Sequence, residues 1–238
     1  MGRPVSWRGA IATLALVLGG GAGASATTVQ VIGHSRQGRA IKAIHTGNST
    51  GPRVLIVGCI HGNECAARAL TRPLLAANVN MNLWIIPTLN PDGLRYATRQ
   101  NGAGVDLNRN WRRRWVRSGR PWSTYYSGPS PFSEPESKAG RAFILRFKPQ
   151  VTIWYHQHMN LVWASGNSVG SGGIYARAVG MTMRTDDTIR GTATGWQRRI
   201  FPASAAFVVE LPSGLMRSSA RAAHVRAIGA VAAAARTG

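Results

Sequence analysis

Hydrophobic and polar residues alternate along two short segments near the start of the chain. Residues 28–33 and 40–45 both show this alternation, and the polar residues 36–39 lie between them. A period of two is typical of strands with one buried face, so the sequence predicts a β-hairpin. Residues 54–60 are then apolar without interruption, which indicates a strand buried on both faces of a sheet.

Apolar runs and helical spacing take turns along the rest of the chain. Strands are predicted at 81–89, 151–155 and 206–211, a turn at 90–93, and helices at 64–77, 133–147 and from about residue 216. Ser133 and Glu136 have the spacing of a capping box at the start of the second helix. Residues 94–133, rich in Gly, Arg, Asn and Trp, are expected to form a long functional loop. Strands that alternate with helices predict an α/β fold with helices on the faces of one sheet.

The first 26 residues have the three parts of an export signal. A start with two arginines is followed by an apolar stretch at 9–19 and by small residues at 24–26. The apolar stretch is shorter than the ~20 residues that a membrane-spanning helix needs, although a short uncleaved anchor is an alternative. We therefore expect a signal peptide at 1–26, one folded domain at 27–238, and no transmembrane span in the mature chain.

The chain is strongly basic, with 29 Lys and Arg against 8 Asp and Glu and a net charge of +21 over 238 residues. Such an excess favours a polyanionic partner, although a GC-rich genome, which biases codons toward arginine, is the plainer explanation. Segment 111–122 holds five arginines and three tryptophans, so it is either a contact for an anionic wall polymer or a solvated loop with aromatic anchors. Because of the export signal, no nucleic acid is expected as a partner.

The compartment also affects how the two cysteines are interpreted. In an oxidising environment Cys59 and Cys65 are equally compatible with a disulfide and with two buried thiols.

Asp186 and Asp187 lie in a polar stretch and are interpreted as surface acids.

Four polar side chains lie near the carboxyl ends of predicted buried strands. They are His61, Glu64, His156 and Glu210. Ligands gather at this edge of such sheets, so the four side chains are expected to converge. Two histidines and one glutamate form a three-ligand zinc set with a fourth position open for water. His158 is an alternative to His156, because residues two apart in an extended segment face the same way.

Six short motifs connect the chain to a known family. They are His61-Gly-Asn-Glu64, Asn90-Pro-Asp-Gly93, Val105-Asp-Leu-Asn-Arg-Asn-Trp111, Pro131-Phe-Ser-Glu-Pro-Glu136, Trp154-Tyr-His156 and Val208-Val-Glu-Leu211. In this order they resemble the zinc carboxypeptidase family, and within it the short bacterial branch that trims peptidoglycan peptides. The resemblance implies a single-domain mixed twisted sheet with helices on both faces, and one zinc ion per chain.

The resemblance also implies roles for individual residues. His61, Glu64 and His156 would bind zinc, and Glu210 would be the general base that passes a proton from water to the leaving amine. Asp106 resembles the acid that orients the first zinc histidine.

Three more residues resemble groups that bind the substrate. Asn108 and Arg109 match the pair that holds the terminal carboxylate, for which an arginine fork is suited. Arg99 matches the arginine that polarises the scissile carbonyl. The family usually closes the substrate end with a tyrosine, but none lies between residues 178 and 210. Residues 191–196 instead resemble the pocket stretch of the bacterial branch.

We therefore expect an exported, monomeric zinc metallopeptidase that acts on peptidoglycan stem peptides, at the γ-D-glutamyl bond to meso-diaminopimelate. A general metallocarboxypeptidase acting on ordinary L-peptides would share every catalytic residue. A related deacylase of N-acylated amino acids is a third candidate, and a non-enzymatic cationic protein that binds wall polymers is a fourth.

Overall fold

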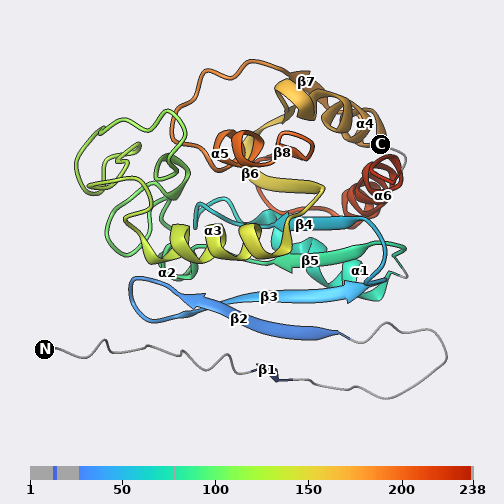
Figure 1. Ribbon diagram of the computed structural model, residues 1–238, viewed down its shortest axis with the longest axis horizontal. Helices are drawn as coiled ribbons and strands as arrows, with labels where there is room; N and C mark the ends of the chain where they lie inside the picture. Colours follow the sequence, from blue (N-terminus) through green and yellow to red (C-terminus); the bar gives the residue numbers. More distant parts are fainter. Residues whose placement is uncertain (1–12, 15–26, 78, 237–238) are drawn as a thin grey trace, which may run out of the picture.

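A mixed β-sheet lies at the centre of the structure, a computed structural model that describes residues 13–14, 27–77 and 79–236 (Figure 1). Among these residues the sheet has eight strands, in the order β1-β2-β3-β5-β4-β6-β7, with β8 paired to β6. The strands are β1 Thr13–Leu14, β2 Thr28–His34, β3 Ala40–Gly47, β4 Arg53–Val57, β5 Asn82–Ile86, β6 Val151–Trp163, β7 Thr182–Arg184 and β8 Ala205–Pro212.

Strand direction changes across the sheet. From β1 to β5 the pairs are antiparallel, and they include the predicted β2–β3 hairpin. From β5 onward the pairs β5–β4, β4–β6, β6–β8 and β6–β7 are parallel. Most residues of β4 and β8 and the first six residues of β6 are buried, as expected for parallel strands with helices on both faces. Their carboxyl ends form the edge at which the polar side chains were expected.

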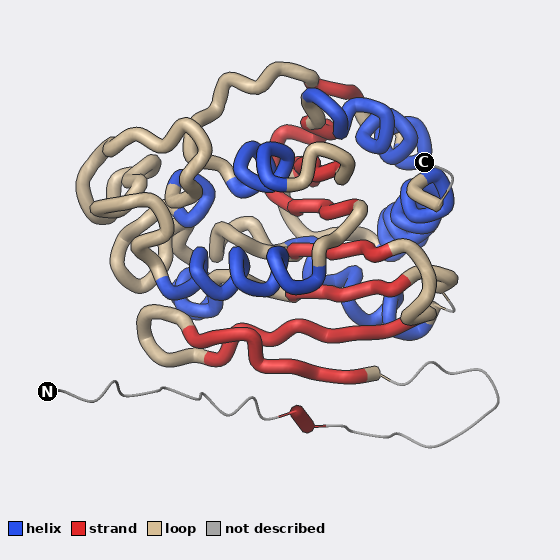
Figure 2. The backbone as a smooth tube through the Cα atoms, viewed as in Figure 1, coloured by secondary structure: helices blue, strands red, loops and turns tan. Residues whose placement is uncertain are grey.

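Helices lie on both sides of the sheet (Figure 2). They are the 3-10 helices η1 Ala66–Leu70, η2 Leu107–Arg109 and η3 Gly166–Ser168, and the α-helices α1 Thr71–Ala76, α2 Pro91–Tyr96, α3 Pro135–Phe147, α4 Val169–Val179, α5 Ala193–Ile200 and α6 Ser218–Ala234. One hydrophobic core joins the sheet to η1, α1, α4 and α6, and a second joins it to α3, α5 and the segment around η2. The predicted α/β fold, a mixed sheet with helices on both faces, is confirmed.

Some local predictions need correction. The helix expected over 64–77 begins only at Ala66 and is a 3-10 helix as far as Leu70. The turn expected at 90–93 is the start of α2, where the Asn90 side chain accepts a hydrogen bond of 2.9 Å from the Gly93 amide. Strand β6 continues well past the predicted strand 151–155, so His156 lies inside the strand and not after it.

The predicted capping box is wrong. No side chain caps α3, and the Ser133 hydroxyl instead donates to the neighbouring Glu134. The buried Glu136 carboxylate accepts hydrogen bonds from the Arg36 amide at 2.8 Å and the Asn101 side-chain amide at 3.0 Å. A buried carboxylate must find donors, and here the hairpin turn and the long loop supply them. Glu136 therefore ties three segments together.

The export signal predicted at 1–26 lies outside the described residues, apart from the two residues of β1. Across the part of the chain that the structure describes, we find no helix with the length and apolar character needed to cross a bilayer.

Candidate metal centre and substrate cleft

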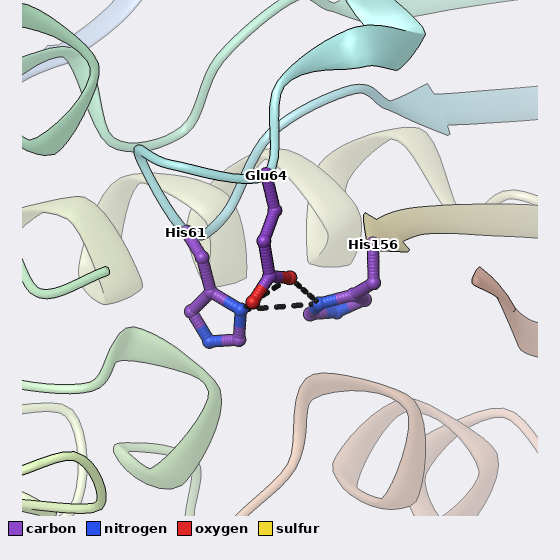
Figure 3. A group of neighbouring side chains, drawn as sticks. All are labelled: His61, Glu64 and His156. Atoms are coloured by element: carbon purple, nitrogen blue, oxygen red, sulfur yellow. Dashed lines mark hydrogen bonds and ion pairs between the residues drawn. The ribbon is translucent and has the colours of Figure 1, made fainter. Parts of the chain in front are cut away.

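Three buried side chains meet at the carboxyl edge of the sheet (Figure 3). His61 and Glu64 belong to the turn that follows β4, and His156 lies in the neighbouring strand β6. His61 Nδ1 is 2.9 Å from Glu64 Oε2 and 3.1 Å from His156 Nδ1. His156 Nδ1 is 2.9 Å from the same glutamate oxygen. The absence of a side chain at Gly62 allows this turn to pack closely against Gly93, because a Cβ at residue 62 would collide with the Gly93 backbone.

These donor atoms fit a zinc ion in type and spacing. Ligand atoms at about 2.0–2.1 Å from one tetrahedral zinc lie about 3.3 Å from each other, close to the separations found here. The group also carries a negative charge that attracts a cation, because the Glu64 carboxylate is ionised. Burial acts to raise the pKa of Glu64, but hydrogen bonds with His156 and His61 outweigh it and hold that pKa well below its usual range. His61, Glu64 and His156 could therefore hold a metal ion.

Asp106 lies directly behind the first histidine. Its Oδ1 is 2.8 Å from His61 Nε2, so the other ring nitrogen, Nδ1, faces Glu64 and His156. Burial acts to lower the pKa of His61, but Asp106 and Glu64 raise it above the ordinary value. A carboxylate in this position fixes the orientation of a ligating imidazole.

Arg99 lies beside the donor group and lines the cleft. Its Nη1 donates to Glu64 Oε1 at 2.6 Å, and its Nη2 donates to Asp106 Oδ2 at 2.9 Å. The guanidinium therefore bridges the two carboxylates that contact His61 and offsets part of their negative charge. The structure brings Arg99 to the cleft with the other predicted site residues, and the sequence did not anticipate these two ion pairs.

Glu210 faces the same cleft from β8. It is paired in register with His156, and it lines the cavity. Its Oε2 atom is buried and has no hydrogen-bond partner among the described residues, a property shared there only with Trp111 Nε1 and Ser137 Oγ. A buried carboxylate oxygen without a partner is costly, so it marks a site built to meet a group from outside.

Asn108 and Arg109 form the wall next to the donor group. Asn108 Nδ2 is 3.4 Å from His156 Nε2, and its Oδ1 accepts from the Ala193 amide at 3.0 Å. Arg109 donates to the Asn108 carbonyl at 2.8 Å, and burial lowers the pKa of its guanidinium. The Tyr125 ring lies 5.0 Å from the Arg109 guanidinium carbon.

Sequence reasoning missed Tyr125, which lines the cleft and is 55% exposed. Its ring also lies 5.7 Å from the Arg99 guanidinium carbon, so it covers both arginines. A tyrosine at the substrate end was expected only between residues 178 and 210. Within the long loop, the hydrophobic pattern gives no sign of which aromatic residue faces the cleft.

The cavity that these residues share has a volume of about 300 Å³. Asp186 and Asp187, interpreted from the sequence as surface acids, are both partly exposed and line it. Asp187 is half-buried and accepts from Arg113 at 2.7 Å and Arg198 at 2.9 Å. His158 also lines the cavity but is exposed and lies outside the donor group, which contains His156.

Two segments beside the centre were ambiguous in sequence. Cys59 and Cys65 form a disulfide that flanks the His61–Glu64 turn. Segment 111–122 is divided: Trp111 is fully buried in the core, whereas Trp122 is 58% exposed. The segment is therefore not one continuous arginine–tryptophan surface.

Comparison of sequences finds relatives named as carboxypeptidases. The chain is 30% identical over 167 residues to carboxypeptidase B of Astacus astacus. The aligned region covers 56% of this chain and 55% of that protein. It is 32% identical over 143 residues to a metallocarboxypeptidase A-like protein of Trichophyton verrucosum, which covers 47% of this chain and 34% of that protein. The chain thus spans about half, or less, of the length of these relatives.

Solved structures share the fold. Carboxypeptidase A from Helicoverpa armigera superposes with a TM-score of 0.74 at 22% identity, over 89% of this chain and 69% of that chain. The murein-tripeptide amidase MpaA from Escherichia coli O157 superposes with a TM-score of 0.66 at 20% identity, over 87% of this chain and 91% of that chain. At such identities the likeness concerns the fold alone.

The profile of the family described as zinc carboxypeptidase matches residues 22–169, more than half of the chain. That match and the His–Glu–His donor group confirm the zinc cofactor predicted from the sequence. On the combined evidence of the profile, the fold and the donor group, the chain belongs to the zinc carboxypeptidase family.

Proposed function

We propose that this chain is an exported zinc-dependent peptidase that hydrolyses the γ-D-glutamyl bond to meso-diaminopimelate in peptidoglycan stem peptides. The observation that carries the proposal is the meeting of three kinds of group in one cleft. The His61–Glu64–His156 donors, the unpartnered Glu210 oxygen and the Arg109 guanidinium all line it. Donors for a metal that activates water, a general base and a cation that binds a carboxylate are together suited to hydrolysis of a bond next to a free carboxylate.

The proposed roles follow from this arrangement. His61, Glu64 and His156 would hold zinc, which when bound would supply a Lewis acid and lower the pKa of water to about 7. Glu210 takes the proton from the attacking water and donates it to the amine that leaves when the C–N bond breaks. Asp106 keeps the His61 ring in its ligating orientation.

The substrate is positioned by the wall of the cleft. Arg109 binds the carboxylate of the residue that is released, because a guanidinium fork matches a carboxylate in a way that lysine does not. Asn108 adds a side-chain amide beside it. Arg99, held between Glu64 and Asp106, provides positive charge near the carbonyl.

Three observations favour a wall peptide over an ordinary peptide. The likeness to a murein-tripeptide amidase extends over most of both chains. Residues 1–26 have the pattern of an export signal, and peptidoglycan lies outside the membrane. Of the charge of +21, only Arg3 and Arg8 lie within residues 1–26, so the remaining +19 suits an anionic wall, which the exposed arginines of segment 111–122 would contact. The second candidate is a general metallocarboxypeptidase, which the names of the sequence relatives favour.

Mass spectrometry of one reaction separates the two candidates. The zinc-loaded protein is mixed with L-Ala-γ-D-Glu-meso-diaminopimelate and an ordinary L-peptide, with a chelator-treated sample as the control. Chelator-sensitive release of free diaminopimelate alone supports the proposal. Release of a C-terminal residue from the L-peptide alone replaces it with the general carboxypeptidase. If neither substrate is cleaved, a non-enzymatic protein that binds wall polymers becomes the better explanation.

A further inference from the structure

Arg198 lines the cleft as a third arginine beside Arg99 and Arg109. Helix α5 places Thr194 and Arg198 one turn apart, and both line the cavity. The Arg198 side chain is only 11% exposed. Its Nη2 donates to Asp187 Oδ1 at 2.9 Å, and its Nη1 donates to the Ala206 carbonyl at 3.3 Å. These contacts fix the position of the guanidinium in the cleft wall.

The charge around Arg198 is not balanced. Asp187 also accepts from Arg113 Nη1 at 2.7 Å and lies 3.8 Å from Arg114 Nη1. One carboxylate therefore serves three guanidinium groups. The adjacent Asp186 is occupied by Arg184. Burial lowers the pKa of Arg198, and nearby Arg113 lowers it further while Asp187 opposes the change. A second anion beside Arg198 would therefore stabilise its buried positive charge, which Asp187 only partly offsets.

We propose that Arg198 selects substrates in which the released residue carries a carboxylate at the end of its side chain. This inference rests on the proposed function and names the feature of the substrate that the cleft recognises. Arg109 and Arg198 are separate anchors, and each would hold one carboxylate. meso-Diaminopimelate has a carboxylate at both ends, and its distal ammonium group would lie against Asp187. Lysine lacks the second carboxylate.

The same ion pairs also have a structural role, because they join the 113–114 and 186–187 segments. Arg113 separates the two roles. It binds the same carboxylate as Arg198, but it does not line the cavity. Replacing Arg113 disturbs the ion-pair network but removes no side chain that lines the cleft. Replacing Arg198 disturbs both.

The test compares kcat and KM for two pairs of substrates. The first pair is L-Ala-γ-D-Glu-meso-diaminopimelate and L-Ala-γ-D-Glu-L-Lys, which differ by one carboxylate. The second pair is benzoylglycyl-L-glutamate and benzoylglycyl-L-glutamine. The zinc-loaded wild type is expected to prefer the carboxylate-bearing member at least about tenfold in kcat/KM. In Arg198→Gln this preference falls to about threefold or less, mainly through a higher KM, whereas Arg113→Gln keeps it.

The outcomes distinguish this inference from the proposed function. Preference within the benzoylglycyl pair, with no cleavage of the γ-D-glutamyl pair, would retain the role of Arg198 and refute the wall-peptide function. Cleavage of both γ-D-glutamyl peptides at equal rates would retain the function and refute the role of Arg198. Equal loss of preference in the two variants would also refute it. Calorimetry with free meso-diaminopimelate and lysine gives a readout without turnover, and equal binding by the wild type would overturn the inference.

Discussion

The buried residue His224 makes a stability prediction that does not depend on the reaction. It lies in α6 with 4% of its surface exposed, and its Nδ1 is 2.6 Å from the Tyr175 hydroxyl. That hydroxyl in turn lies 2.5 Å from the hydroxyl of Tyr155. Burial lowers the pKa of His224 to about 4 from an ordinary value of 6.5. The imidazole is therefore neutral at pH 7 and can accept the proton of Tyr175.

The sign of the effect follows from proton binding in the two states. Between pH 6.5 and 4 the unfolded chain carries the proton on this histidine and the folded chain does not. The unfolded state therefore binds more protons, and stability falls as the pH falls through this window. From pH 7.5 to pH 5.0 the two pKa values give a loss of about 2 kcal/mol from His224.

Urea unfolding measures this loss when the wild type is compared with His224→Gln at both pH values. Glutamine does not titrate, and its side-chain oxygen can still accept from Tyr175. All other titrating groups, including the zinc site, are common to both proteins and cancel from the difference. The free energy of unfolding of the wild type should fall about 2 kcal/mol more than that of the variant. A difference that stays constant with pH would refute the reasoning, and the exposed His34→Gln is the matched control.

Four further predictions concern three residues of the metal centre and cleft and the disulfide beside them. Glu210→Gln should retain zinc, measured by metal analysis, and lose about 10²–10⁴-fold in kcat, so activity like the wild type would remove it from the mechanism. Asp106→Asn should weaken zinc binding about 10–100-fold in a chelator competition, and unchanged affinity would contradict its contact with His61. Arg109→Lys should raise KM about tenfold or more, because the fork is lost; a change in kcat alone would argue against a carboxylate clamp. Replacing Cys59 and Cys65 with alanine should lower the free energy of unfolding by about 2 kcal/mol in thermal melts, and an unchanged melting temperature would contradict a stabilising disulfide.

The sequence predicted the parts of the site that follow from strand order. Polar residues after or within buried parallel strands must meet at one edge, and His61, Glu64, His156 and Glu210 do line one cleft. The hydrophobic pattern likewise predicted the hairpin and the buried strands, because burial on one or two faces leaves a direct trace in the residue order.

The parts that escaped prediction depend on contacts between distant segments. Asp187 faces the cleft because Arg113 and Arg198, which lie 74 and 11 residues away, bind its two oxygens. The position of Trp111 also depends on distant residues. Its ring is 5.0 Å from that of Trp196 and 5.7 Å from that of Trp154, so a tryptophan of the arginine-rich segment belongs to the core. Local patterns carry no information about such partners.

The register of β6 against β8 has a consequence for how this kind of enzyme diversifies. His156 and Glu210 are opposite one another in a parallel ladder, where backbone hydrogen bonds hold strands about 4.8 Å apart. The separation between the metal ligand and the proposed base is thus set by the sheet. Tyr125, Asp187 and Arg198 contact the cleft from loops and from α5. Exchange of loops would therefore alter selectivity without changing the spacing of His156 and Glu210, so the proposed reaction and the proposed preference are separable traits.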